Sequence, residues 1–138
     1  MPAKILIVDD DPDLVELLQQ ALTSAGYQAE TAANGSEALS KAQRSPPDLM
    51  VLDVLLPEVD GYSICETLRR DPATASIPII IITVLPGEFP RLAGMEAGAD
   101  AYVNKPFHVE ELLSRIGQLL SQEGRRNAEG VTAKKAAA

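Results

Sequence analysis

The sequence predicts an α/β fold in which one parallel, five-stranded sheet carries helices on both faces. Short apolar runs without polar alternation, typical of strands buried on both faces, alternate with segments whose apolar residues recur at helical spacing. The length of 138 residues suits a single domain. Strands and helices that alternate in this way are joined by right-handed crossovers, so the sheet is expected to be doubly wound.

The first strand is predicted at residues 5–8, a run of Ile, Leu and Val that stops abruptly at three aspartates. An amphipathic helix follows, with apolar residues at helical spacing from Leu14 to Ala25. Pro12 suits the first turn of this helix and Gly26 suits its C-terminal stop.

The next strand, residues 27–32, alternates between apolar and polar residues and is therefore expected at an exposed edge of the sheet. A weaker helix over residues 36–44 ends before two consecutive prolines. Residues 49–52 form a second fully apolar strand, which ends at Asp53.

A helix is predicted over residues 61–70, followed by a strand of four isoleucines at 79–82 that ends at Thr83. A shorter helix over residues 88–97 is expected to be interrupted by Pro90.

Pro86 and Gly87 also crowd the start of this helix and should shorten or bend its first turn. Residues 101–103 are the last, short strand, and the clearest helical stripe of all runs from Val109 to Leu120. The strand order 2-1-3-4-5 fits best, because it places the edge-like strand outside and the purely apolar strands inside.

Residues 124–138 are polar and Ala-rich, and we expect them to be a flexible tail behind a domain of residues 1–123.

The net charge of −8 and the absence of Trp argue against direct binding to nucleic acid. No apolar run is long enough to span a membrane. A single cysteine, Cys65, and a start without a signal-peptide pattern favour a reducing, cytoplasmic setting, with Cys65 a small core residue.

Polar residues follow the predicted strands at one edge of the sheet. They are Asp9 and Asp10 after the first strand, Asp53 after the third, Thr83 after the fourth and Lys105 after the fifth. Open α/β sheets bind ligands at this edge, where the strand order reverses. Three carboxylates gathered there would repel one another, so a hard cation such as Mg²⁺ is expected.

The same residues suit the chemistry of a phosphoryl group. Asp53 stands alone at the end of a central strand and could act as a nucleophile that forms an acyl phosphate, while Lys105 and Thr83 could contact the phosphoryl oxygens. Each residue also has a purely structural explanation, because the aspartates could cap the following helix and the others could belong to turns. Their joint occurrence after four strands favours a site.

Four motifs carry a resemblance to a known family: ILIVDDD at residues 5–11, DVLLPEVDG at 53–61, IIIT at 80–83 and AGADAYVNKPF at 97–107. Together they resemble the receiver domain of two-component response regulators, as in the single-domain chemotaxis and sporulation regulators, over residues 4–121. The resemblance implies a flavodoxin-like (βα)5 domain that acts as a phosphorylation switch rather than as an enzyme with turnover.

The resemblance also implies roles for individual residues. Asp53 would be the phospho-acceptor, and Asp9, Asp10, Asp53 and the backbone carbonyl of Leu55 would bind Mg²⁺. Thr83 and Lys105 would contact the phosphoryl group, with Thr83 and Tyr102 as the switch pair. The Lys105–Pro106 bond is often cis in the family.

The implied phosphodonor is a phosphohistidine on a sensor histidine kinase or a phosphotransfer protein. The implied output is a change of protein partner at the face formed by the fourth helix, fifth strand and fifth helix. We expect a monomer or weak dimer, and a downstream target that is a protein. His108, the only histidine, is expected to have a capping or solvent role.

Departures from the family pattern concern the neighbours of Asp53 and Thr83. Leu55 and Leu85 are apolar where polar side chains in relatives help to orient an attacking water, so slow hydrolysis of the acyl phosphate is expected. Val84 stands where the family usually has Ala, and its bulk should crowd the route to the phosphoryl group.

Three other functions are compatible with parts of this pattern. An aspartate-nucleophile hydrolase of the haloacid dehalogenase class would need an acid at position 55, where this chain has Leu55. A flavodoxin-like cofactor module would need a phosphate loop in place of the three aspartates. A receiver-like binding module that works without phosphorylation would be expected to lack Asp53, Thr83 or Lys105, and all three are present.

Overall fold

The computed structural model describes residues 2–128, with side chains as far as Gln122. Five strands and five helices alternate along this part of the chain. The strands are β1 (Lys4–Val8), β2 (Gln28–Ala32), β3 (Leu49–Asp53), β4 (Ile79–Thr83) and β5 (Ala101–Asn104). The helices are α1 (Pro12–Ser24), α2 (Gly35–Arg44), α3 (Gly61–Arg70), α4 (Glu88–Ala97) and α5 (Val109–Ala128).

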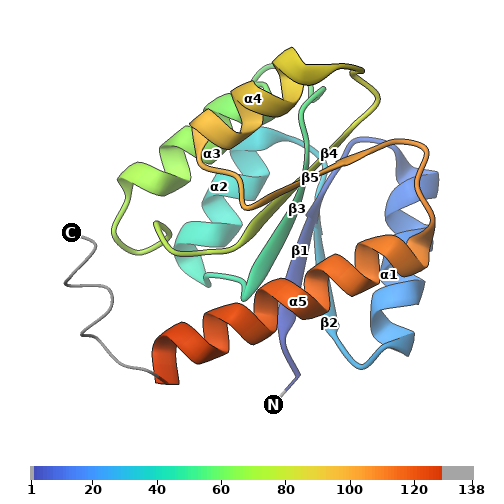
Figure 1. Ribbon diagram of the computed structural model, residues 1–138, viewed down its shortest axis with the longest axis vertical. Coiled ribbons are helices and arrows are strands. Elements are labelled where there is room, and N and C mark those ends of the chain that lie inside the picture. Colours follow the sequence, from blue (N-terminus) through green and yellow to red (C-terminus); the bar gives the residue numbers. More distant parts are fainter. Residues whose placement is uncertain (1, 129–138) are drawn as a thin grey trace.

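The strands form one parallel sheet in the order β2-β1-β3-β4-β5, which confirms the predicted topology and the edge position of the second strand. Helices α1 and α5 cover one face of the sheet, and α2, α3 and α4 cover the other (Figure 1). In the registers, Val8 pairs with Leu52 and Thr83 pairs with Asn104, so the carboxyl ends of these strands lie along one edge.

Alternate residues of each strand supply two separate apolar cores. On the side of α2, α3 and α4, one core contains Leu6, Met50 and Ile81. On the side of α1 and α5, the other contains Ile7, Val51 and Ile80. Strands β3 and β4 are buried along their whole length, because a parallel sheet covered on both faces shields its inner strands from water.

Side chains at the N-cap fix the starts of three helices. The side chains of Asp11, Asn34 and Asp60 accept hydrogen bonds from backbone amides in the first turns of α1, α2 and α3. Helix α4 differs, because its N-cap is Gly87, with φ 96°, and no side chain caps it.

Two sequence-based expectations about helices need correction. Helix α4 is continuous through Pro90, because this proline falls in the first turn, where a backbone N–H has no intrahelical acceptor to lose. Helix α5 runs to Ala128 rather than ending before the expected tail at Gly124. Arg125, Arg126 and Ala128 have high helix propensity, which explains the extension. The rest of the expected tail lies outside the described residues.

Gly61 brings α3 close to the end of β3. A Cβ atom at this position would lie 2.6 Å from the carbonyl oxygen of Asp53 and 2.7 Å from the Cα of Val54. The Gly61 amide also donates to the Val54 carbonyl at 2.9 Å. The loop that follows Asp53 is therefore packed against the start of α3. Within residues 2–128, no helix is both long and apolar enough to cross a membrane.

Candidate functional site

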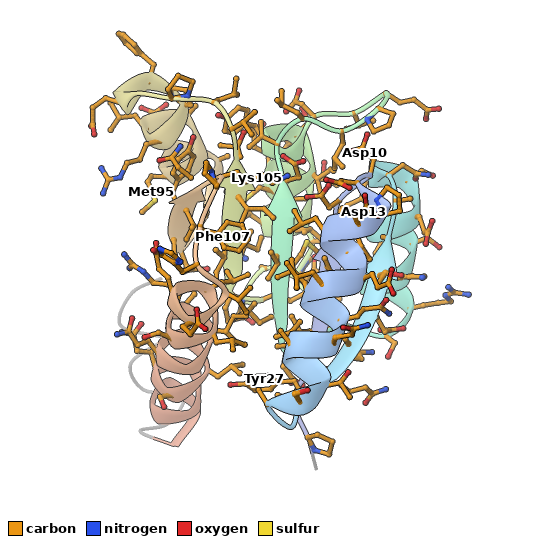
Figure 2. All side chains as sticks on the ribbon, turned by 90° about the vertical axis from the view of Figure 1, so that its right-hand side faces the viewer. Asp10, Asp13, Tyr27, Met95, Lys105 and Phe107 are labelled. Atoms are coloured by element: carbon orange, nitrogen blue, oxygen red, sulfur yellow. The ribbon has the colours of Figure 1, made fainter. Side chains whose placement is uncertain are left out.

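Three carboxylates gather at the carboxyl edge of the sheet. Asp9 follows β1 and Asp53 ends β3, and both are buried, whereas Asp10 is exposed. One carboxylate oxygen of each residue lies within 4.8 Å of those of the other two. Figure 2 shows Asp10 and Lys105 at one end of the molecule and Tyr27 at the opposite end. The structure thus brings together acids that are far apart in the chain.

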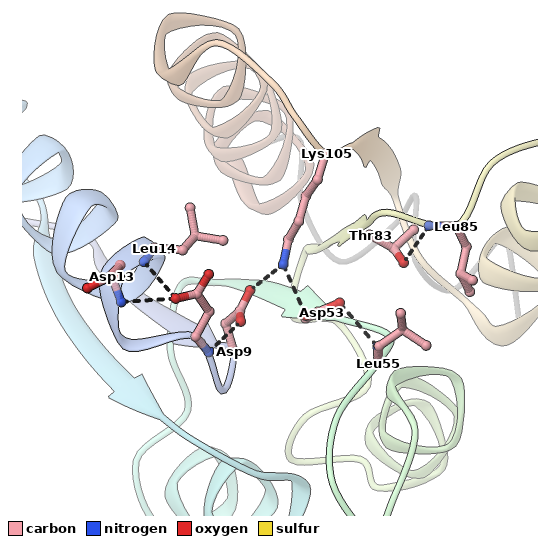
Figure 3. A network of polar contacts seen from close by, with 9 residues as sticks. Asp9, Asp13, Leu14, Asp53, Leu55, Thr83, Leu85 and Lys105 are labelled. Atoms are coloured by element: carbon pink, nitrogen blue, oxygen red, sulfur yellow. Dashed lines mark hydrogen bonds and ion pairs between the residues drawn. The ribbon is translucent and has the colours of Figure 1, made fainter.

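Lys105 joins two of these acids. Its Nζ donates to Asp9 Oδ2 at 2.8 Å and to Asp53 Oδ2 at 3.1 Å, although these residues are 96 and 52 positions away in the chain (Figure 3). The Lys105 backbone amide donates to the Thr83 carbonyl at 2.8 Å, which fixes the lysine beside the end of β4. The following Lys105–Pro106 peptide bond is cis, as the resemblance implies.

Asp53 is a buried carboxylate with hydrogen bonds to both of its oxygens. Oδ1 accepts from the Leu55 backbone amide at 3.1 Å, while Oδ2 accepts from Lys105. Burial raises the pKa of Asp53, and the negative charge of Asp9 raises it further, while the bonds to Leu55 and Lys105 oppose the shift. The charged form of Asp53 is therefore destabilised in the folded chain.

The site has more negative than positive charge. Burial alone would lower the pKa of Lys105, but hydrogen bonds and charges from Asp9 and Asp53 outweigh it, and the pKa is raised. One ammonium group therefore stands against three carboxylates, and the uncompensated negative charge favours binding of a further cation. Oxygen ligands of this kind suit Mg²⁺, which binds through one or two carboxylates and keeps several waters.

The three consecutive aspartates have different surroundings, which sequence alone did not separate. Asp11 is the cap of α1, since its Oδ1 accepts from the amides of Asp13 and Leu14 at 3.1 and 3.4 Å. Asp9 Oδ1 accepts from the Asp11 amide at 2.9 Å, which orients its other oxygen toward Lys105. The capping explanation thus applies to Asp11, while Asp9 and Asp10 face the edge of the sheet.

Thr83 and Tyr102 meet at the segment that follows β4. Thr83 is fully buried, and its Oγ1 accepts from the Leu85 amide at 3.2 Å. The half-buried Tyr102 donates its hydroxyl to the Leu85 carbonyl at 3.3 Å. Leu85 is therefore held at its amide by one expected switch residue and at its carbonyl by the other.

Sequence reasoning missed two other polar contacts of this segment. Asn104 Nδ2 donates to the Leu85 carbonyl at 3.0 Å, and the Tyr62 hydroxyl donates to the Pro90 carbonyl at 3.0 Å. The position of Asn104 directly before Lys105 offered a hint, but no spacing rule connects Tyr62 in α3 to a carbonyl in α4. Burial raises the pKa of Tyr102, and the nearby Tyr62 raises it further.

The remaining residues that the sequence singled out differ in how far they are exposed. Leu55 is 49% exposed and Val84 is 57% exposed, whereas Leu85 packs against the core beneath α3 and α4. Cys65 is a fully buried core residue, and burial raises its pKa to about 11. His108 is exposed, and its carbonyl accepts from the Glu111 amide at the start of α5.

A doubly wound domain with an acidic triad and a lysine at the carboxyl edge of the sheet is typical of receiver domains. The family model described as the response regulator receiver domain matches residues 5–117. The chain belongs to this family of two-component signalling proteins.

Curated and solved relatives agree with this assignment. The chain is 43% identical over 122 residues to the DNA-binding dual master transcriptional regulator RpaA of Synechocystis, a match that covers 88% of this chain and 51% of that protein. It thus spans about half the length of the curated relatives it matches.

Among solved structures, a CheY-like receiver domain protein of Methanospirillum hungatei superimposes with a TM-score of 0.86 at 29% identity, covering 91% of this chain and 99% of that one. The BeF3-activated receiver domain of DrrB gives a TM-score of 0.78 at 36% identity, covering 88% and 99%. Residues 5–117 are therefore a receiver domain rather than a conventional enzyme domain, and Asp9, Asp10 and Asp53 form an acidic triad typical of receiver Mg²⁺ sites.

Proposed function

We propose that this receiver is a phosphorylation-activated switch whose phospho-acceptor is Asp53. Receiver domains partner with histidine kinases, and the donor here would be a phosphohistidine on a sensor histidine kinase or a phosphotransfer protein. A carboxylate oxygen of Asp53 attacks phosphorus, the N–P bond of the donor breaks, and the histidine leaves as a neutral imidazole after protonation. The product is a mixed anhydride on Asp53.

The observation that carries this proposal is the double contact of Lys105 Nζ with Asp9 Oδ2 and Asp53 Oδ2. A lysine held at this point can transfer its hydrogen bond to a phosphoryl oxygen on Asp53, since its ammonium is a mobile point charge. Asp9, Asp10, Asp53 and the Leu55 carbonyl would hold Mg²⁺, which neutralises charge on the transferring group when bound.

The proposed output follows from the contacts of Leu85. If Thr83 turns toward a phosphoryl group, its bond to the Leu85 amide is lost, and Tyr102 then loses a fixed partner. The face of α4, β5 and α5 would change, and a downstream protein would read the change. We further propose a cytoplasmic location, a monomer or weak dimer, and a receiver domain that begins near the first residue and ends within α5.

Two alternatives fit less well. A phosphohydrolase would need an acid or base beside Asp53, but position 55 carries the apolar and half-exposed side chain of Leu55. A binding module without phosphorylation would have no use for a buried carboxylate that is costly to ionise, whereas Asp53 is such a carboxylate.

Incubation with Mg²⁺ and acetyl phosphate, followed by intact mass spectrometry, tests the proposal. The wild type should gain one phosphoryl group, and Asp53→Asn should gain none. Failure of the wild type to gain mass would favour the binding module, while release of phosphate over many turnovers would favour the hydrolase.

A further inference from the structure

The segment from Leu85 to Pro90 connects the buried Thr83 to the first turn of α4. Prolines at positions 86 and 90 restrict the backbone φ angle, and Gly87 stands between them at φ 96°. Because Gly87 offers no side chain, α4 begins without a side-chain cap. Contacts from other elements therefore contribute more to the position of the start of α4 than a side-chain cap does.

Tyr62 supplies one such contact from α3. Its hydroxyl donates to the Pro90 carbonyl at 3.0 Å, across 28 positions of the chain. Its ring is half-buried and packs against the same apolar core as Leu85 and Tyr102. Two tyrosines thus bind carbonyls of one short segment, Tyr102 at its beginning and Tyr62 at its end.

The two tyrosine contacts differ in their relation to the acidic pocket. Tyr102 binds Leu85, whose amide is bonded to Thr83, and so its contact depends directly on Thr83. The Tyr62 contact has no such direct link to Thr83, because it joins α3 to Pro90 inside α4 and does not involve Leu85. A displacement of Leu85 reaches Pro90 through a segment that contains two residues with restricted φ angles.

We propose that Tyr62 is a positioning residue which holds the first turn of α4 in its unphosphorylated arrangement and thereby opposes activation. This inference rests on the proposed phosphorylation of Asp53. A hydrogen bond made in only one of two states shifts the equilibrium toward that state by its own net free energy. Loss of the Tyr62 hydroxyl should therefore favour the activated arrangement without any change in the acidic pocket.

The test measures the affinity for beryllofluoride with Mg²⁺ in the wild type, Tyr62→Phe and Tyr27→Phe by titration calorimetry. Tyr62→Phe keeps the packed ring and should bind beryllofluoride about fivefold more tightly, the usual effect of one hydrogen bond. Tyr27→Phe is the matched control, because Tyr27 packs against the core on the opposite face of the sheet. Its affinity should stay within about twofold of the wild type.

Amide hydrogen exchange in the wild type provides a second measurement that needs no substitution. Exchange at residues 91–94 should increase when beryllofluoride binds, and Tyr62→Phe should show the increase already without it. Equal or weaker affinity in Tyr62→Phe, or unchanged exchange in the wild type, would overturn the inference, because Gly87 would then absorb the movement. Absence of beryllofluoride binding to the wild type would instead overturn the proposed function.

Discussion

Asp53 is a buried carboxylate whose charge the folded chain disfavours, and its replacement should show this cost. Burial raises the pKa of Asp53 above its usual range. A raised carboxyl pKa means that the folded state binds the proton more tightly, so ionisation at neutral pH reduces stability. We predict that Asp53→Asn increases the free energy of unfolding at pH 7 without Mg²⁺ by about 0.5–2 kcal/mol.

The stability gained by Asp53→Asn should depend on pH. The advantage of Asp53→Asn should shrink as the pH falls through the folded pKa of Asp53, because the wild-type carboxyl then becomes neutral. Chemical denaturation between pH 4 and 8 measures it, with exposed Glu96→Gln as a control that also removes one negative charge. A less stable Asp53→Asn at pH 7 would show that the attraction to Lys105 exceeds the cost of burial.

Bound Mg²⁺ should offset the repulsion between the carboxylates and so stabilise the folded state. Binding to the folded state alone stabilises it by about 2.7 kcal/mol at a hundredfold excess over the dissociation constant, so the wild-type Tm should rise with Mg²⁺ and fall again with chelator. Asp10→Asn should show a smaller rise at each concentration, because one of the clustered acids is lost. Asp13→Asn, an exposed acid in the first turn of α1, is the control. Equal shifts in Asp10→Asn and the wild type would contradict the site.

Leu55 should make the acyl phosphate long-lived. Its exposed side chain cannot orient a water molecule by hydrogen bonding. We predict that phosphorylated wild type survives far beyond seconds and that Leu55→Asn shortens its half-life on the order of tenfold. Intact mass measured over time after removal of the phosphodonor tests this, with Val59→Asn in the same loop as control. Loss of the phosphoryl group within seconds in the wild type would contradict the prediction.

At the scale of elements, the close approach of α3 to β3 keeps the loop after Asp53 in place. Gly61→Ala would push a Cβ atom against the backbone of Asp53 and Val54, and we predict a destabilisation of about 1–3 kcal/mol. Gly117→Ala in α5 is the matched control, since a Cβ atom there meets nothing within 4 Å. It should stabilise the helix by about 0.5–1 kcal/mol. Thermal unfolding measures both, and equal effects would contradict the packing explanation.

Most elements could be predicted from sequence because apolar runs and helical spacing determine burial. The predicted bounds of α3 and α4 agree with the structure. The predicted interruption of α4 at Pro90 was wrong, since the effect of a proline depends on which turn of the helix it occupies. The gathering of Asp9, Asp53 and Lys105 followed from strand order alone. The contact of Tyr62 with Pro90 could not be predicted from sequence, because it depends on how two helices pack side by side.

At the scale of the whole molecule, the net charge of −8 should prevent binding to DNA. RpaA is described as DNA-binding, but this chain spans only about half of that protein. We predict no change in the fluorescence anisotropy of a labelled DNA duplex at physiological salt. Poly-lysine on the same duplex is the positive control, and salt-sensitive binding by this chain would contradict the prediction.

The sheet keeps the two apolar cores apart, so each half of the interior can change without repacking the other. The side chains of the core beneath α2, α3 and α4 form a cluster separate from those beneath α1 and α5, because neighbouring strand residues point in opposite directions. Substitutions beneath α4 can therefore accumulate while the opposite half keeps its packing. In evolution, the packing beneath α4 could in this way be altered while the packing beneath α1 and α5 stays as it is.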